Sequence, residues 1–316
     1  MTIGDLLKVR VHAISFETET VRVFEFRDLD GNELPAFDAG SHIDVHVSET
    51  VCRSYSLINE SDGRRYRIAV ARDDAGRGGS KLMHSQVAVG QSISISRPRN
   101  NFPLVEDAGP SILIAGGIGV TPLLAMLNRL ESIGKPWELH YGSRTPEATA
   151  FSEVLRRDFR HGSVQICYSE PNNNFIDIKG LVQTAPPGAH FYCCGPKAQL
   201  DAFLEAVQDL PSEQVHFERF GGDVDHAGGG FDVILARSGK ALRVGEGQSI
   251  LDRLLEEGID IPNSCREGVC GACETRLIAG EGDHRDLIQT DKEKAGNRTI
   301  FPCCSGSLGP SLTLDL

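Results

Sequence analysis

The chain has 316 residues, of which 40% are hydrophobic and 24% are charged, and its formal net charge is −12. This length predicts about two to three domains, and the composition is that of an ordinary globular protein with buried cores. The excess of acidic residues argues against nucleic acid or an anionic membrane as a partner, and no apolar run approaches the roughly 20 residues that span a bilayer.

The first 103 residues are predicted to form short strands separated by turns. β-branched and aromatic residues dominate each strand, and turn sequences such as Asp30-Gly31-Asn32 lie between them. Six strands without intervening helices predict a closed six-stranded antiparallel barrel over residues 1–103. The expected strands are Lys8–Ser15, Val21–Arg27, Ile43–Val47, Cys52–Ile58, Tyr66–Arg72 and Ser92–Arg97.

The fourth of these strands carries a candidate flavin site. Arg53 presents a planar fork suited to phosphate, and Tyr55 shares its face of the strand and can stack on an isoalloxazine ring. The hydroxyl of Ser56 can hydrogen-bond the flavin N5. The competing interpretation is a half-buried strand with one exposed arginine.

A second segment, G-R-G-G-S at residues 76–80, favours the flavin interpretation. It precedes a stretch with helical spacing. Backbone N–H groups and a hydroxyl at a helix start form a phosphate site, so Gly78, Gly79 and Ser80 are candidate ligands.

From about residue 104 to 220 the pattern changes to alternating strands and helices. Alternation of this kind predicts a parallel α/β sheet. The expected strands are Ser111–Ala115, Trp137–Tyr141, Val164–Tyr168, His190–Cys194 and Gln214–Arg219, and the expected helices are Leu123–Ser132, Phe151–Phe159 and Ala198–Leu210.

The first strand of this sheet is followed by a G-x-G-x-x-P sequence. Gly117 and Gly119 would let a pyrophosphate approach the helix N-terminus, and Thr121 lies beside them. Pro122 suits the first helical position because its missing N–H needs no partner there. Alone the motif is weak, since the third glycine of the ordinary dinucleotide fingerprint is absent.

The second strand ends at the position expected for an adenosine ribose. Ser143 and Arg144 are candidate contacts, and Arg144 could stack on adenine or bind a 2′-phosphate. No second basic residue stands close in sequence, and Glu147 would repel a phosphate. NADH is therefore expected in preference to NADPH.

A glycine-rich stretch at 221–230 is predicted to be a linker between domains. Residues 231–316 beyond it predict a hairpin, Phe231–Arg237 with Ala241–Val244, and a helix at Ile250–Glu257 that Ser249 caps. Strands at Glu274–Ile278 and Ser311–Leu316 complete a compact module.

Four cysteines in this module carry the strongest motif in the chain. Cys265, Cys270 and Cys273 have C-x4-C-x2-C spacing, and Cys303 follows after 29 further residues. This is the thiolate framework of a plant-type 2Fe–2S cluster. Structural zinc is the alternative, but it usually needs a second cysteine or histidine pair that the chain lacks.

Together these segments resemble the ferredoxin-NADP reductase superfamily, and most closely the phthalate dioxygenase reductase type, over the whole chain. The order of flavin, nicotinamide and ferredoxin domains implies FMN as the flavin and a β-grasp plant-type ferredoxin fold for residues 231–316. The resemblance places Cys194, Gly195 and Pro196 beside the nicotinamide and an aromatic ring, Phe220, on the flavin face. Ser56, Thr121, Cys194 and Phe220 are then the candidates for the hydride-transfer site.

Two further cysteines, Cys193 and Cys304, are sequence neighbours of the candidate residues Cys194 and Cys303. Cys193 is expected to be a buried hydrophobe and not a cofactor contact. Alignment with the family's final cysteine motif makes Cys303 the fourth ligand and leaves Cys304 on the opposite face of an assumed strand. Family members usually carry an arginine where this chain has Gly306, which puts partner docking in doubt.

The resemblance implies a cytoplasmic reductase that passes electrons from NADH through FMN and the cluster to a Rieske-type terminal oxygenase. A start without a secretory signal pattern and nine cysteines agree with a reducing compartment. The alternatives are a reductase for a cytochrome P450 or another monooxygenase, and a redox-sensing module without turnover.

Overall fold

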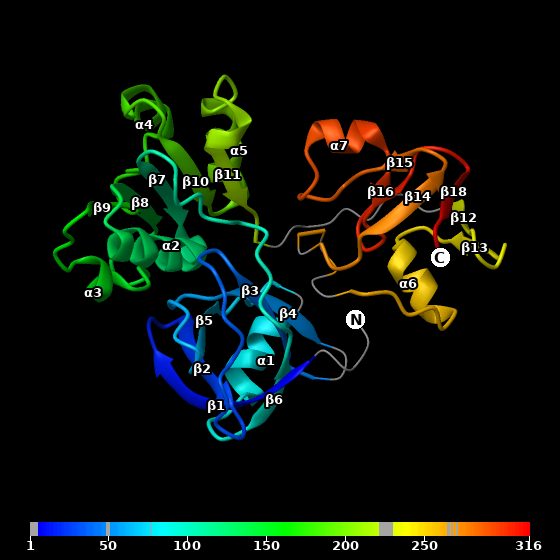
Figure 1. The fold of residues 1–316 in the computed structure, drawn as a ribbon, viewed down its shortest axis with the longest axis horizontal. Helices are drawn as coiled ribbons and strands as arrows, with labels where there is room; N and C mark the ends of the chain where they lie inside the picture. Colours follow the sequence, from blue (N-terminus) through cyan, green and yellow to red (C-terminus); the bar gives the residue numbers. More distant parts are fainter. Residues whose placement is uncertain are drawn as a thin grey trace. The chain divides into compact units, whose positions relative to one another are not determined.

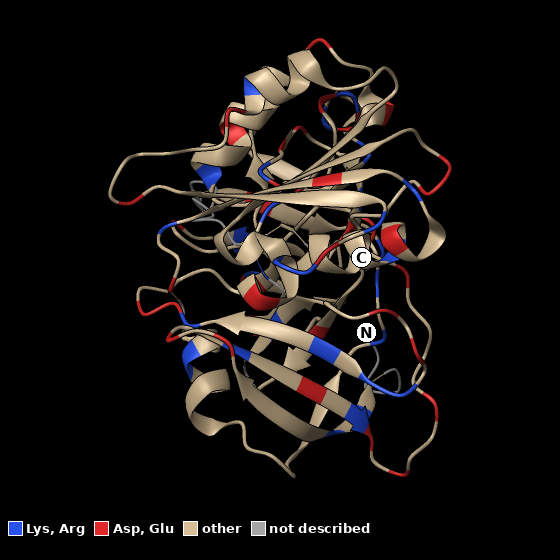
Figure 2. Cartoon of the chain, turned by 90° about the vertical axis from the view of Figure 1, so that its left-hand side faces the viewer, with Lys and Arg blue, Asp and Glu red and all other residues tan. Residues whose placement is uncertain are grey.

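A computed structural model describes residues 6–48, 51–76, 78–220, 230–263, 266, 268–269 and 271–316. The described chain divides into two compact units, one of them Leu6–Phe220 and the other the segment from Gly230 onward (Figure 1). In these residues no helix is long and apolar enough to cross a membrane. Figure 2 shows acidic and basic residues interspersed along the chain.

The first six strands form one antiparallel sheet that closes on itself. They are β1 (Leu7–Phe16), β2 (Val21–Asp28), β3 (His42–His46), β4 (Cys52–Ser56), β5 (Tyr66–Ala71) and β6 (Ser92–Ile95), in the order β4-β3-β6-β1-β2-β5. A bridge between Leu57 and Ile68 joins the two edge strands. Alternate residues such as Val9 and Val11 are buried inside, as period-2 patterning requires. The short helix α1 (Gly79–Gln86) adds Met83 to this core.

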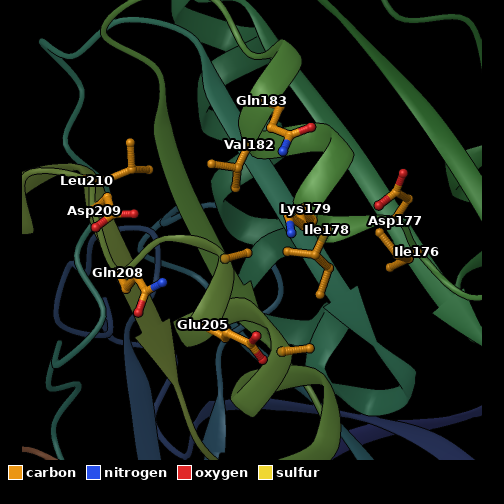
Figure 3. Close-up of a pocket in the computed structure, with 12 residues that line it drawn as sticks. Ile176, Asp177, Ile178, Lys179, Val182, Gln183, Glu205, Gln208, Asp209 and Leu210 are labelled. Atoms are coloured by element: carbon orange, nitrogen blue, oxygen red, sulfur yellow. The ribbon is translucent and has the colours of Figure 1, made fainter.

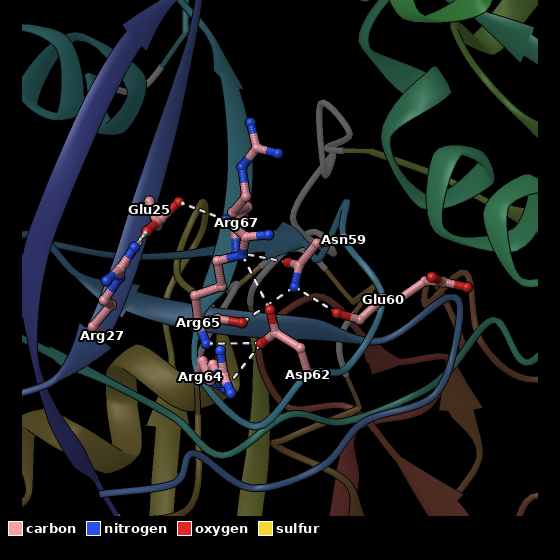
Figure 4. Close-up of polar contacts among 8 residues, drawn as sticks. All are labelled: Glu25, Arg27, Asn59, Glu60, Asp62, Arg64, Arg65 and Arg67. Atoms are coloured by element: carbon pink, nitrogen blue, oxygen red, sulfur yellow. Dashed lines mark hydrogen bonds and ion pairs between the residues drawn. The ribbon is translucent and has the colours of Figure 1, made fainter. Parts of the chain in front are cut away.

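Polar contacts fix the connection between β4 and β5 (Figure 4). Asp62 Oδ1 accepts hydrogen bonds from the backbone N–H groups of Arg64 (2.9 Å) and Arg65 (3.1 Å). Asn59 accepts from the N–H of Arg67 at 2.8 Å and donates to the Arg65 carbonyl at 3.2 Å. The strand that carries the predicted flavin residues therefore ends in an ordered turn.

The α/β part of the same unit is a five-stranded parallel sheet. Its strands are β7 (Ser111–Gly116), β8 (Trp137–Ser143), β9 (Gly162–Tyr168), β10 (His190–Cys194) and β11 (Val215–Glu218), in the order β11-β10-β7-β8-β9. The helices α2 (Val120–Ile133) and α3 (Ser152–Leu155) contribute to the core on one face. The helices α4 (Ile178–Thr184) and α5 (Lys197–Ala206) pack on the other. Short 3₁₀ turns occupy Gly117–Gly119 and Ser212–Gln214.

One hydrophobic core joins the barrel to this sheet. It combines Val23 and Ile58 of the barrel with Leu113, Val120 and Leu123 of the α/β part. The Tyr192 hydroxyl also accepts a hydrogen bond from the Val105 N–H at 3.0 Å. Residues from both parts can therefore meet in one fixed site.

The C-terminal unit is a mixed sheet with a helix packed into its core. Its strands and helices are β12 (Phe231–Leu235), β13 (Ala241–Val244), α6 (Ile250–Glu256), β14 (Thr275–Ala279), β15 (Gly282–Asp283), α7 (Asp291–Gly296), β16 (Thr299–Ile300), β17 (Gly306–Ser307) and β18 (Ser311–Leu314). The main sheet has the order β13-β12-β18-β14-β16, with β12 and β18 parallel. Ser249 caps α6 by accepting from the Asp252 N–H at 3.0 Å. The predicted fold class, barrel, parallel α/β sheet and β-grasp module, is confirmed.

Three local predictions were wrong. The helix expected over Phe151–Phe159 is a single turn, because Phe151 has a left-handed φ of 64° and Phe159 instead packs edge-on to Trp137 at 4.8 Å. Pro122 is the third residue of α2 and not the first, although it still lies in the turn whose N–H groups have no helical partner. Cys303 and Cys304 lie in a turn and not in a strand.

Candidate functional site

The two segments predicted to bind flavin phosphate lie against each other. A Cβ atom placed on Gly79 would lie 2.6 Å from the Cγ and Nε atoms of Arg53. The absence of a side chain at Gly79 therefore lets the start of α1 lie against the Arg53 side chain in this conformation. Gly78, the N-cap residue of α1, has a φ of 83°, and the Ser80 hydroxyl accepts from the Asp73 N–H at 3.0 Å. An arginine fork beside helix N–H groups is a suitable setting for a phosphate.

Tyr55 and Ser56 project from opposite faces of β4, as successive strand residues do. Tyr55 is half-buried, whereas Ser56 is buried. The Ser56 side chain hydrogen-bonds the carboxyl group of Glu218, which lies at the end of β11. The predicted flavin strand is thereby linked directly to the α/β sheet.

The two predicted nicotinamide segments also meet. A Cβ atom on Gly119 would lie 2.3 Å from the Cys194 carbonyl oxygen and 2.8 Å from the Gly195 nitrogen, so glycine is required for this approach. Gly117 has a φ of 52°, and a Cβ atom there would meet nothing within 4 Å, which leaves its backbone open to a ligand. Pro196 begins the turn into α5 as its N-cap residue. Thr121 is buried and donates to the Ile118 carbonyl at 2.9 Å, so its hydroxyl serves the local backbone.

Glu218 is a site residue that the sequence did not single out. It is the register partner of Cys194 on the neighbouring strand and interacts electrostatically with its thiol. Its Oε2 atom is buried with no hydrogen-bond partner in the described part of the chain. Cys193 instead packs among residues of the opposite face of the sheet. Ser56, Cys194 and Glu218 thus form one group of neighbouring side chains, the Ser56 cluster. Glu218 precedes Phe220 by two residues in the sequence.

Burial raises the pKa of Glu218 to about 8, more than the Ser56 hydrogen bond lowers it. The folded state therefore retains a proton that the unfolded chain releases above its ordinary carboxyl pKa of 4.5. Stability should fall as the pH rises from 4.5 to about 8 and then level off, with a slope of at most about 1.4 kcal/mol per pH unit.

We expect Glu218→Gln to remove this component of the pH dependence, because glutamine keeps a hydrogen-bonding side chain but cannot ionise. Thermal unfolding of the flavin-free protein between pH 5 and 9 measures it. The exposed Glu205→Gln is the matched control and should follow the wild type. A Glu218→Gln curve parallel to the wild type would contradict the assignment.

The predicted ribose contacts lie at the end of β8. Ser143 is buried, and its hydroxyl donates to the Thr145 carbonyl at 3.3 Å. Arg144 is exposed and pairs with Glu170, 3.6 Å from Nε to Oε1. Glu147 instead accepts hydrogen bonds from its own backbone N–H and from the Thr145 side chain, and these bonds lower the pKa of its carboxyl group. The carboxylate that faces Arg144 is therefore Glu170.

Two of the four predicted cluster ligands lie in the described residues. Cys273 and Cys303 are both buried, and the Cys303 thiol hydrogen-bonds those of Cys273 and Cys304. Cys265 and Cys270 lie outside the described residues. Gly268 and Gly271, in the loop between the ligands, have φ values of 69° and 75°, which only glycine adopts freely.

These residues fit the groups that the sequence predicted. Buried thiols brought together by a tight glycine loop are the donor set of an iron–sulfur cluster. In the Ser56 cluster, Glu218 Oε2 is a buried polar atom without a hydrogen-bond partner among the described residues. Buried polar groups are normally satisfied, so this region fits a polar ligand such as a flavin or nicotinamide.

A separate pocket lies between α4 and α5 (Figure 3). Ile178, Val182, Glu205 and Asp209 line it, and the predicted site residues are not among its lining residues. The pocket is thus formed by α4, α5 and neighbouring residues, whereas the Ser56 cluster lies where the barrel meets the sheet.

Known proteins share these features. Residues 233–306 match the model of the 2Fe-2S iron-sulfur cluster binding domain. Over 313 residues the chain is 43% identical to the phenoxybenzoate dioxygenase subunit beta of Ectopseudomonas oleovorans, covering 98% of this chain and 97% of the relative. The solved structure of phthalate dioxygenase reductase, described as modular for electron transfer from pyridine nucleotides to [2Fe–2S], matches with a TM-score of 0.77 and 37% identity. That match covers 99% of this chain and 98% of the other.

A type IV self-sufficient cytochrome P450 monooxygenase also matches, with a TM-score of 0.83 and 35% identity. The match covers 98% of this chain but 41% of that protein. Fold and site together define an iron–sulfur flavoprotein oxidoreductase. The chain belongs to the phthalate dioxygenase reductase family. The match to the cluster-binding domain makes a 2Fe–2S cluster one of its redox groups.

Proposed function

We propose that the chain is the reductase component of a two-component oxygenase and passes electrons from NADH to a Rieske-type terminal oxygenase. The observation that carries this proposal is the cluster of Ser56, Cys194 and Glu218, which joins the predicted flavin strand to the predicted nicotinamide strand. A separate unit of the same chain holds the cysteine loop. The similarity to a dioxygenase subunit along nearly the whole chain supports an oxygenase partner.

In this proposal the polypeptide binds and orients the redox groups, which supply the chemistry. The flavin would accept a two-electron hydride, and the cluster would carry single electrons. Arg53, Gly78, Gly79 and Ser80 hold the flavin phosphate, and Tyr55 stacks on its ring. Gly117, Gly119 and Thr121 shape the turn at the pyrophosphate, and Cys194, Gly195 and Pro196 lie beside the nicotinamide. Ser56 and Glu218 provide a hydroxyl and a carboxyl group where the flavin and nicotinamide rings meet, and Phe220 covers the flavin face.

The proposed domains are residues 1–103 for FMN, 104–220 for NADH and 231–316 for the cluster, with 221–230 as the linker. We place the protein in the cytoplasm. All seven cysteines in the described residues are free thiols, a state that reducing conditions preserve.

Anaerobic mixing with NADH tests the function directly. Flavin absorbance should bleach first and cluster absorbance next, and a Rieske oxygenase should then accept the electrons. A protein that binds both groups but is not reduced by NADH would be a sensor and not a reductase. The second candidate, a P450 reductase, is favoured by the self-sufficient P450 match, and faster transfer to a P450 than to a Rieske protein would select it.

Coenzyme preference provides a further prediction. NADH should be preferred, because Glu170 pairs with Arg144 and would repel a 2′-phosphate. Glu170→Gln should raise the NADPH-to-NADH ratio of kcat/KM by about 1.4- to fivefold, since an exposed ion pair is worth roughly 0.2–1 kcal/mol. Glu147→Gln is the control and should leave the ratio unchanged, because Glu147 bonds Thr145. An equal response to both substitutions would contradict the role of Glu170.

A further inference from the structure

Asp286 is a buried acid to which the sequence assigned no chemistry. Its side chain is 0% exposed. The Oδ1 atom accepts hydrogen bonds from the backbone N–H groups of Ile288 (3.1 Å) and Gln289 (2.7 Å). The Oδ2 atom is buried and has no hydrogen-bond partner in the described residues. An acid buried in this way is energetically costly, so its presence calls for an explanation.

This acid lies against the loop that bears the predicted cluster ligands. The Leu287 N–H donates to the Gly268 carbonyl at 2.9 Å. A Cβ atom on Gly268 would lie 3.1 Å from the Asp286 Cα and 2.5 Å from the Cys304 Sγ. Asp286 also interacts electrostatically with the Cys304 thiol, which neighbours Cys303. The carboxyl group is therefore held close to the Cys304 sulfur atom, which belongs to the residue after the predicted ligand Cys303.

Nearby cations are engaged by other oxygen atoms. Lys294 Nζ donates to the main-chain carbonyl of Asp286 at 2.6 Å, and the Arg285 guanidinium pairs with Asp283 at 2.7 Å. Within the described part of the chain the Asp286 carboxylate forms no ion pair. Its charge thus acts on its surroundings in a medium that screens it less than water does.

We propose that Asp286 sets the reduction potential of the 2Fe–2S cluster. A fixed negative charge beside the cluster disfavours the addition of an electron, so Asp286 lowers the potential. This inference rests on the proposed cluster site. The two backbone hydrogen bonds that Oδ1 accepts keep the carboxylate in place, so its effect does not require contact with iron.

Asp286→Asn tests the charge with little change in shape, because the asparagine oxygen can accept the same two N–H groups. The cluster potential of the full-length holoprotein is measured by a redox titration followed by EPR. We expect an upward shift that raises the equilibrium constant for cluster reduction by about tenfold, equivalent to about 59 mV for one electron. Asp291→Asn, which removes an exposed acid at the start of α7, is the control and should leave the potential unchanged. An unchanged potential in Asp286→Asn overturns the proposal.

If Asp286→Asn does not retain its cluster, Asp286→Ser decides. The serine hydroxyl can accept a hydrogen bond from the same backbone N–H groups but carries no charge, so the potential should again rise. An unchanged or lower potential in Asp286→Ser then overturns the proposal. The wild-type titration separates this inference from the proposed function: absence of a 2Fe–2S EPR signal there would contradict the cluster site itself.

Discussion

A chain that ends at Gly222 is expected to fold, bind FMN and oxidise NADH with ferricyanide as fast as the full-length protein. It should fail to reduce cytochrome c or the terminal oxygenase. The reason is the division of the structure: Leu6–Phe220 is a compact unit whose cores include no residue beyond 220. The truncated chain keeps Ser56, Glu218 and Phe220 but loses all the cluster ligands.

Two assays separate the steps. Ferricyanide accepts electrons from the flavin, whereas the protein acceptors require the one-electron route through the cluster. The full-length chain with the Glu205→Gln change, an exposed residue outside the flavin and cluster segments, serves as the matched control and should keep both activities. Undiminished reduction of the oxygenase by the truncated chain would contradict the electron path. An insoluble fragment would contradict only the independence of the unit.

Elements with strong period-2 or apolar patterns were predicted well from sequence. His190–Cys194 and Ala241–Val244 have the predicted bounds. The short helices α4 and α7 were missed, although each has a side-chain cap: Asp177 in α4, and a capping box of Thr290 and Glu293 in α7. Caps alone are weak indicators when only six or seven residues follow, because such helices depend on tertiary packing.

The parts of the candidate site that depend on glycine spacing could be predicted from the sequence. The parts that depend on which side chains the fold buries could not. The contacts of Gly79 with Arg53 and of Gly119 with Cys194 join segments that the motifs had marked separately. Glu218 could not be found in this way. A glutamate in a strand normally faces solvent, and only the fold shows that Glu218 is half-buried and hydrogen-bonded to the barrel residue Ser56, which is distant in sequence.

The second prediction with a large effect concerns which of Cys303 and Cys304 is the fourth cluster ligand. Cys303→Ser should abolish the 2Fe–2S absorption, as should Cys265→Ser, Cys270→Ser and Cys273→Ser. The reason is that four cysteine thiolates together hold the two irons of this type of cluster. Cys304→Ser should retain it. The assumed strand geometry does not support this distinction, since both residues lie in a turn and both are buried. The contacts of the two thiols support it instead.

The Cys303 thiol hydrogen-bonds Cys273, another predicted ligand, whereas the Cys304 thiol also lies 3.6 Å from the Phe301 carbonyl and 3.7 Å from the Ser305 hydroxyl. Serine at 304 can keep hydrogen bonds to these oxygen atoms, so that variant should fold normally. Iron content and visible absorption of the purified proteins measure the outcome. The reverse result, a cluster in Cys303→Ser and none in Cys304→Ser, would move the ligand by one residue. A cluster in both variants would mean that either thiol can complete the site, because the two sulfur atoms lie within hydrogen-bonding distance of each other.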